Sequence, residues 1–376
     1  MRKISLLIII IVLLVTITGC KKEKNVAENN GEGLTPTTQP IVTLPPEVSP
    51  GEEEIEESAG EENVITLEDY YPLEADTEYV YEGEGNEYAS YRRFIDYIDT
   101  KNKKIQTRTN NGGTETVRVI QIKDGAISVI YLVNESYSRV NFMTQEATDN
   151  TEILLMEPLK KGTTWQLKDG RTRYISAEKV PVNTPYGSFE TLEVTTESED
   201  STTKDYYAAG VGLVKSLFQS EGLEISSTLS TVNKDAVLTQ PFTLYYPDAD
   251  EKIYPDQTEL TMKTGTEVLS VLQEAMKTEP LKASYLPLMS RNTRINSLTM
   301  EENNVLHVDF SPEFVTEMNA GAGYELLILQ SVTNTLGNYY GTSKVLITLE
   351  GKPYESGHIL MNEGELLEVN MENVVE

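Results

Sequence analysis

The sequence has 376 residues, of which 31 are Lys or Arg and 60 are Asp or Glu, so its formal net charge at pH 7 is −29. This acidity disfavours nucleic acid as a partner, because phosphates require a positive face. It also disfavours a protein that lies flat on anionic lipid. The single cysteine excludes an intramolecular disulfide and a cysteine-based metal site.

The first twenty residues have the pattern of a bacterial export signal. Arg2 and Lys3 precede an apolar run over residues 4–17, which is shorter than the ~17–25 residues of a spanning helix. Residues 17–20 read Ile-Thr-Gly-Cys and resemble a lipobox. We therefore expect a signal peptide over residues 1–19 and a diacylglycerol on Cys20, whose two acyl chains anchor stably. The alternatives are an uncleaved anchor helix and a secreted protein cleaved elsewhere.

Residues 20–64, from the predicted lipidated cysteine onward, have the composition of a disordered linker. Several prolines, an acidic run over residues 52–57 and few clustered apolar residues leave too little surface to bury. A flexible coil of about 43 residues reaches roughly 35–40 Å, so we expect the folded part to stand away from the membrane. Abundant Lys, Asn, Glu and Ile with little Arg favour a Gram-positive source.

Residues 65–235 show the alternation of β-strands and no helical period. Short β-branched and aromatic runs are separated by turns such as Asn110–Gly113 and Lys123–Gly125, at the spacing of antiparallel hairpins. We expect an antiparallel all-β domain. Its predicted strands are Tyr79–Tyr81, Tyr91–Ile98, Lys104–Thr109, Thr116–Ile122, Ile127–Val133, Arg173–Ala177, Phe189–Thr195, Leu213–Phe218 and Leu223–Thr231.

Tyrosine is in excess, with 21 residues against seven Phe and one Trp. Exposed tyrosine rings stack on sugars and on partner proteins. The alternative is strand propensity in a half-exposed sheet. The tyrosines concerned cluster around the first predicted hairpin: Tyr79, Tyr81, Tyr88, Tyr91 and Tyr97.

Three glycine-containing stretches of this region are Pro158–Trp165, Tyr186–Phe189 and Tyr206–Lys215. Together they resemble an uncharacterised exported β domain that occurs in many Gram-positive lipoproteins. The resemblance covers about half of the region and implies no activity. The glycines fit turns at positive φ.

Residues 236–376 alternate strands and helices. Thr266–Lys277 is amphipathic, and Thr264 and Glu267 have capping-box spacing at its start. The other predicted elements are the strands Phe242–Tyr246, Arg294–Met300, Val305–Phe310 and Ser343–Leu349 and the helix Glu325–Gly337. The order β-α-β-β-α-β predicts a split α/β sandwich in which two helices cover one face of a small sheet. The whole chain is then of the α+β class.

Four motifs give this region a family resemblance: Leu244–Asp248, Val305–Ser311, Glu325–Leu327 with Ser331–Leu336, and Lys344–Gly351. Their order and spacing resemble the GerMN domain of sporulation and spore germination proteins, over Phe242–Gly364. The resemblance implies a non-enzymatic extracytoplasmic module, often on lipoproteins and similar to ring-building motifs. It links the chain to sporulation, germination or envelope assembly.

Catalytic and metal-binding patterns are not evident in the sequence. The two histidines, His307 and His358, are interpreted as structural or surface residues, and the usual nucleophile, zinc and phosphate-loop motifs do not occur. Asp248 and Asp250 are interpreted as turn residues. A glycosidase carboxylate pair leaves no spacing signature, so no pair is chosen among 60 acidic residues. We expect no catalytic, cofactor or metal site.

The second predicted C-terminal helix carries an apolar surplus. Its stripe of Ile, Leu and Val suits a sheet, whereas Leu326 and Leu327 fall outside the stripe on a helical projection. Such a surplus either meets the neighbouring helix or marks an interaction surface. The similarity to ring-building motifs favours self-association as one use of such a surface.

These features predict a non-enzymatic binding or scaffold lipoprotein on the extracytoplasmic face of the membrane. Its expected partners are the membrane through the lipid anchor, envelope proteins or peptidoglycan, and a second copy of the chain. The alternatives are a glycan-directed hydrolase and a substrate-capturing lipoprotein of a transporter. The latter predicts a deep cleft between two similar lobes, which the dissimilar halves do not suggest.

Overall fold

The structure is a computed structural model that describes residues 65–147, 151–301 and 303–375. The predicted signal peptide, Cys20 and the linker lie outside the described residues. What is described is mostly antiparallel β-sheet with few helices, which confirms the expected predominance of antiparallel strands in the N-terminal half. Among the described helices, none has the length and apolar character needed to cross a bilayer.

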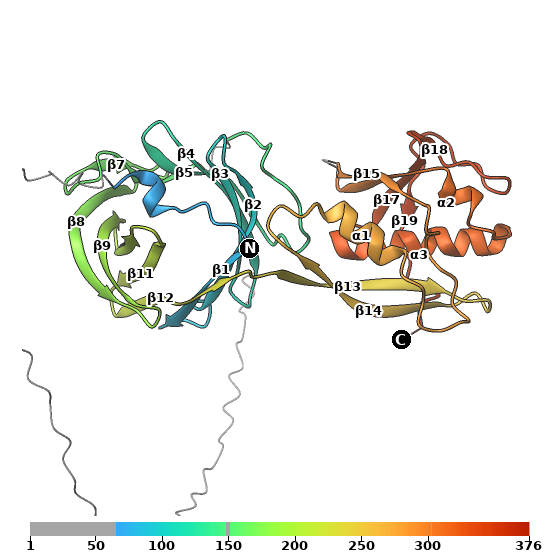
Figure 1. The fold of residues 1–376 in the computed structure, drawn as a ribbon, viewed down its shortest axis with the longest axis horizontal. Coiled ribbons are helices and arrows are strands. Elements are labelled where there is room, and N and C mark those ends of the chain that lie inside the picture. Colours follow the sequence, from blue (N-terminus) through green and yellow to red (C-terminus); the bar gives the residue numbers. More distant parts are fainter. Residues whose placement is uncertain (1–64, 148–150, 302, 376) are drawn as a thin grey trace, which may run out of the picture. The chain divides into compact units, whose positions relative to one another are not determined.

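Residues 65–235, here called the β region, form one sheet of twelve antiparallel strands (Figure 1). The order is β6-β5-β4-β3-β2-β1-β12-β11-β10-β9-β8-β7, so the first and last strands pair at the centre, with Thr77 opposite Lys234. The strands are β1 (Thr77–Glu84), β2 (Tyr91–Asp99), β3 (Lys104–Asn110), β4 (Glu115–Lys123), β5 (Ala126–Asn134), β6 (Glu152–Met156), β7 (Thr164–Gln166), β8 (Thr172–Asn183), β9 (Ser188–Glu197), β10 (Ser201–Ala208), β11 (Gly212–Ser220) and β12 (Leu223–Lys234).

The twisted sheet rolls up on itself (Figure 1), and side chains join its two edges. Trp165 of β7 donates from its indole Nε1 to the carbonyl of Ile153 in β6, at 3.1 Å. Arg173 of the neighbouring strand β8 donates to the same carbonyl at 2.7 Å. The edge strands, which would otherwise expose unpaired backbone groups, are thereby partly satisfied.

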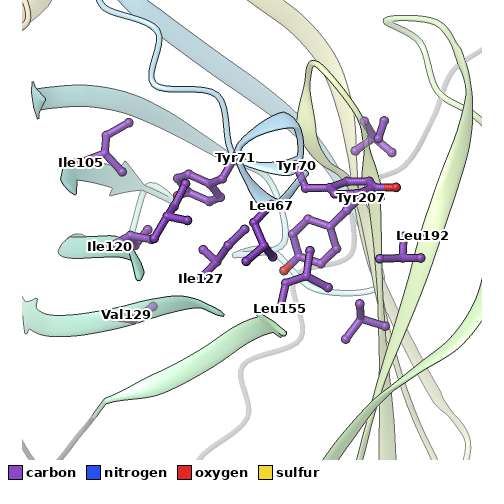
Figure 2. Packing of buried hydrophobic residues seen from close by; sticks show 14 of the residues in the cluster. Leu67, Tyr70, Tyr71, Ile105, Ile120, Ile127, Val129, Leu155, Leu192 and Tyr207 are labelled. Carbon is purple, nitrogen blue, oxygen red and sulfur yellow. The ribbon is translucent and has the colours of Figure 1, made fainter. Parts of the chain in front are cut away.

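A short 3-10 helix, η1 (Leu67–Tyr70), fills part of the space inside the rolled sheet. Leu67, Tyr70 and Tyr71, which we call the plug, are all buried. The backbone amide of Gly210 donates to the carbonyl of Asp69 at 2.7 Å and so fixes the plug to the sheet. Figure 2 shows the plug among wall residues that include Ile105, Ile120, Ile127, Val129, Leu155, Leu192 and Tyr207.

Residues 236–376, the C-terminal region, have their own hydrophobic core. The elements are β13 (Leu238–Pro247), β14 (Ile253–Met262), α1 (Val268–Met276), β15 (Ile295–Met300), β16 (Val305–Phe310), α2 (Glu313–Thr316), α3 (Ala322–Tyr340), β17 (Lys344–Leu349), β18 (Lys352–Pro353) and β19 (Leu367–Glu368). β16 and β17 pair in parallel at the centre of a five-stranded sheet with β15, β18 and β19.

The expected sandwich, with one sheet and two helices on one face, differs from the observed arrangement. β13 pairs with β14 in a separate two-stranded sheet. Helix α3 contacts both β13 and β17, and α1 contacts both β14 and β15, so the helices lie between the hairpin and the larger sheet (Figure 1). β14 was not predicted, because its apolar and polar residues alternate imperfectly. The strand also contains Pro255, a residue that is tolerated on edge strands.

Helix α3 is buried on two sides, which explains why a second layer is needed. The predicted apolar stripe is buried, and the polar residues Ser331, Thr333, Asn334 and Thr335 are equally buried. The hydroxyl of Thr335 accepts a hydrogen bond from the backbone amide of Tyr245 in β13, at 3.1 Å. Short hydroxyl side chains therefore let the hairpin approach the helix and satisfy its backbone.

The predicted capping box at α1 is wrong. Glu267 is the N-cap residue and no side chain caps it. The Thr264 hydroxyl instead donates to the carbonyl of Ile95 at 2.7 Å and accepts from the amide of Asp76 at 2.7 Å. These are bonds to the β region, and both regions belong to the compact unit Glu62–Glu376.

Candidate functional site

The rolled sheet contains a cavity of about 370 Å³ that is partly open to solvent, which we call the chamber. Its wall is built from inward-facing side chains of both halves of the sheet, and Tyr71 of the plug also lines it. A volume of this size lies at the small end of ligand pockets. Tyr88, which is 52% exposed, lines it from the β1–β2 connection and packs on Gly113, where a Cβ would lie 2.6 Å from the ring.

One part of the chamber wall is cationic. Arg93 of β2 and Arg118 of β4 both line it. The Arg93 guanidinium lies over the ring of Tyr79, at 4.5 Å from the centroid, and its buried Nε has no hydrogen-bond partner. Across residues 65–147, 151–301 and 303–375, no carboxylate forms an ion pair with Arg93 or Arg118.

The β8 and β10 part of the wall has its own charges, and most of these are paired. Arg173 forms an ion pair with Glu152, at 2.6 Å between Nη2 and Oε1, and donates from Nε to the Thr196 hydroxyl at 2.7 Å. Asp205 accepts a hydrogen bond from the Ser216 hydroxyl at 2.6 Å. Burial raises the pKa of the Asp205 carboxyl, and the hydrogen bond from Ser216 opposes that shift only in part.

Tyrosines supply the neutral polar surface of the chamber. Tyr91 stacks on Tyr81 with ring centroids 4.4 Å apart. Burial, and then the neighbouring Tyr81, raise the pKa of Tyr91 well above its usual value. Burial is also the main cause that raises the pKa of Tyr71 and that of Tyr207. These phenols therefore stay protonated at physiological pH and act as hydrogen-bond donors.

A second buried charge cluster lies outside the chamber lining and has a structural role. Asp96 lies 3.3 Å from Arg108 and 3.8 Å from Arg139, measured to each guanidinium Nε, and all three side chains are almost fully buried. Arg108 also pairs with Glu115 at 2.7 Å. Arg139 donates to the carbonyls of Asp96 and Lys263, at 2.7 and 2.9 Å. Each cation therefore has several acceptors, although Nε of both arginines and Nη1 of Arg139 are buried without a hydrogen-bond partner.

The structure separates the residues singled out in the C-terminal region. His307 shares a 2.9 Å hydrogen bond with the Thr348 hydroxyl, whereas His358 is exposed. Asp248 accepts from the backbone amides of Asp250 and Lys252, the arrangement of a turn. Within the described part of the chain, no three His, Cys, Asp or Glu side chains gather in a way that could hold a metal ion.

Leu326 and Leu327, the predicted interaction surface, have different environments. Leu326 is 55% exposed and Leu327 is half-buried. Tyr324, two residues earlier on the same helix, is also exposed and donates to the carbonyl of Ala249. Of the two leucines, Leu326 is the one that a partner can reach.

The first-hairpin tyrosines mostly pack inside, as the strand-propensity interpretation predicts. Tyr79, Tyr81 and Tyr97 are buried, and Tyr88 alone of the five is exposed. Sequence analysis missed Arg93 and Arg118. The alternation of Tyr91, Arg93 and Ile95 on one face of β2 carries the signal, but it indicates a chamber only when the sheet is known to roll up.

Comparison with known protein families gives a match in the C-terminal region. Residues 243–355 match the family model Germane, described as sporulation and spore germination. No curated protein matches the chain. The tandem GerMN domains of the Bacillus subtilis sporulation protein GerM are similar at 20% identity and a TM-score of 0.26, over 34% of this chain and 45% of that chain.

Two further solved structures are similar to part of the chain. The first GerMN domain of the same protein has 22% identity and a TM-score of 0.27, over 33% of this chain and 94% of that chain. A protein with a YmcC-like fold from Bacteroides fragilis has 13% identity and a TM-score of 0.28, over 44% of this chain and 99% of that chain. This chain spans less than half of the tandem GerM structure.

Proposed function

We propose that this protein is a non-enzymatic lipoprotein of the cell envelope that binds or scaffolds envelope components in sporulation, spore germination or envelope assembly. The observation that carries the proposal is the match of residues 243–355 to a family described by sporulation and spore germination. The matched residues include the central strands and both longer helices of the C-terminal core. A lipid on Cys20 holds the protein at the extracytoplasmic face of the membrane of a Gram-positive cell.

The contact surface that we assign to this role is the exposed start of α3. Leu326 is a large apolar side chain at 55% exposure, and it lies in a helix that is otherwise extensively buried. Full burial of an exposed leucine is favourable by about 1.5–3 kcal/mol, so Leu326, which is 55% exposed, gains roughly half of that in an interface. The partner is an envelope protein or a second copy of this chain.

Crosslinking in living cells tests the assignment. The wild-type protein, crosslinked in growing and in sporulating cultures, should yield a defined adduct in at least one of the two. Leu326→Lys should lose that adduct by about tenfold or more and melt within a few degrees of the wild type, because the side chain is exposed. Leu281→Lys is the matched control, since Leu281 is 86% exposed in the same region, and it should keep the adduct.

Two outcomes would overturn the assignment. Equal adduct yields from wild type, Leu326→Lys and Leu281→Lys would exclude Leu326 from any contact. Turnover of purified peptidoglycan by the wild type, lost on neutralising one carboxylate, would establish a hydrolase instead.

A further inference from the structure

Unpaired arginines line the chamber of the β region, although the molecule as a whole is acidic. The chain carries a net charge of −29, yet two half-buried arginines, Arg93 and Arg118, line this open cavity without an ion-pair partner among the described residues. Arg92, the neighbour of Arg93 on β2, shows the ordinary arrangement. Its side chain is 69% exposed and lies 3.7 Å from Glu78. An unpaired charge inside a protein is costly, so its retention calls for a reason.

Packing against aromatic rings compensates the unpaired charge of Arg93 only in part. Its guanidinium carbon lies 4.5 Å from the ring centroid of Tyr79 and 5.7 Å from that of Tyr71, so aromatic faces offset some of the lost hydration. Its Nε still lacks an acceptor. Arg118 has neither a ring face nor a carboxylate among the residues that the structure describes. The two side chains therefore offer free donors to the cavity.

We propose that the chamber binds a small acidic sugar, with Arg93 and Arg118 contacting its carboxylate or phosphate group. The planar donor fork of arginine matches both oxyanions. The volume of about 370 Å³ accommodates one small molecule. The anionic group is the shared chemistry, and it distinguishes this ligand from a neutral sugar.

The remaining wall fits the hydroxyl groups and ring of a sugar. Tyr91 and Thr109 line the chamber near the arginines and present hydroxyl groups. Asp205 lines it from β10 and, apart from the bond from Ser216, has acceptor capacity left for a hydroxyl. The half-exposed ring of Tyr88 offers a flat apolar face, on which sugar rings stack.

Calorimetric titration of the full lipidated protein in neutral detergent tests this proposal. The probes are glucuronate, glucose 1-phosphate, inorganic phosphate and glucose. Glucuronate or glucose 1-phosphate should bind at least tenfold more tightly than glucose and than inorganic phosphate. Arg118→Gln should weaken that binding at least tenfold, which corresponds to about 1.4 kcal/mol. Arg92→Gln, which changes the same charge on the outer face of β2, should leave it unchanged.

Several results would overturn the proposal. Neither acidic sugar binding better than glucose would exclude the ligand class, and phosphate binding as well as the sugars would exclude sugar recognition. An equal loss in Arg92→Gln would show that only the overall charge matters. If Arg118→Gln fails to fold, Arg118→Lys keeps the charge but not the fork, and unchanged affinity in that variant would contradict a contact through Arg118. The binding measured in the titration depends on neither the lipid on Cys20 nor the side chain of Leu326, so its outcome is separate from the proposed scaffold function.

Discussion

Successive side chains of a β-strand point to opposite faces of the sheet, and this alternation decides which residues line the chamber. On β2, Arg92 points out to water and Arg93 points into the chamber, so two identical side chains in sequence have opposite roles. The sequence alone shows the alternation but not which face is enclosed. For that reason the alternating residues of this strand could be predicted to face opposite sides, whereas the chamber could not.

Asp205 leads to a prediction about pH. Its pKa is raised by burial, so the folded protein holds the ionised carboxylate less favourably than the unfolded chain does. Stability should therefore increase as the pH falls through the raised pKa towards the ordinary value of 3.8. Asp205→Asn should raise the melting temperature at pH 7 and remove this part of the pH dependence. Melting curves between neutral and mildly acidic pH measure both effects.

The control for this experiment is Asp200→Asn. Asp200 is exposed, at the turn between β9 and β10, so its substitution should leave the melting curve nearly unchanged. A lower melting temperature for Asp205→Asn at pH 7 would mean that the ionised carboxylate stabilises the fold, contrary to this account.

Among the elements, α3 shows what periodicity can and cannot predict. The stripe of Ile328, Leu329, Val332 and Leu336 was predicted, and all four are buried. The burial of the polar residues Ser331, Thr333, Asn334 and Thr335 was not predicted, because such burial depends on residues distant in the sequence. Thr335 accepts a hydrogen bond from Tyr245 of β13, which pairs with the unpredicted strand β14, and Asn334 donates to the carbonyl of Asn370.

Gly337 and Gly323 on α3 form a matched pair for testing this packing. A Cβ on Gly337 would lie 2.4 Å from Cγ2 of Val369 and 2.9 Å from the carbonyl oxygen of Thr342, whereas Gly323 has nothing within 4 Å. Gly337→Ala should lower the free energy of unfolding by about 1–3 kcal/mol through overpacking. Gly323→Ala should leave it unchanged or raise it by up to about 1 kcal/mol through helix propensity. Urea unfolding measures both, and equal effects would contradict the close approach at Gly337.

At the scale of the whole molecule, the β region and the C-terminal region each have a hydrophobic core, and the two cores share no residue. The change in sequence pattern near residue 235 predicts two domains, and in the structure both regions belong to one compact unit, Glu62–Glu376. The hydrogen bonds that join the two regions were not predicted, because Arg139 and Thr264 look like ordinary polar residues in the sequence. In the structure Arg139 is fully buried and donates to the carbonyl of Lys263.

A fragment of residues 236–376 tests whether the second core suffices for folding. We expect it to fold cooperatively, because its core is separate. We also expect it to melt below the full chain, since the Lys263 carbonyl and the Tyr339 hydroxyl lose their partner Arg139. Circular dichroism during thermal unfolding measures both properties. A fragment without secondary structure would show that the two regions depend on each other.

We propose that a lipid on Cys20 places this protein on the outer face of a membrane. The most direct measurement is the incorporation of radioactive palmitate by cells that produce the wild type or Cys20→Ala. Cys20 is the only cysteine in the sequence, so no other thiol can accept the lipid. We predict a labelled wild-type protein in the membrane fraction and an unlabelled variant that is unprocessed or released. A labelled Cys20→Ala variant, or an unlabelled wild type, would contradict the account.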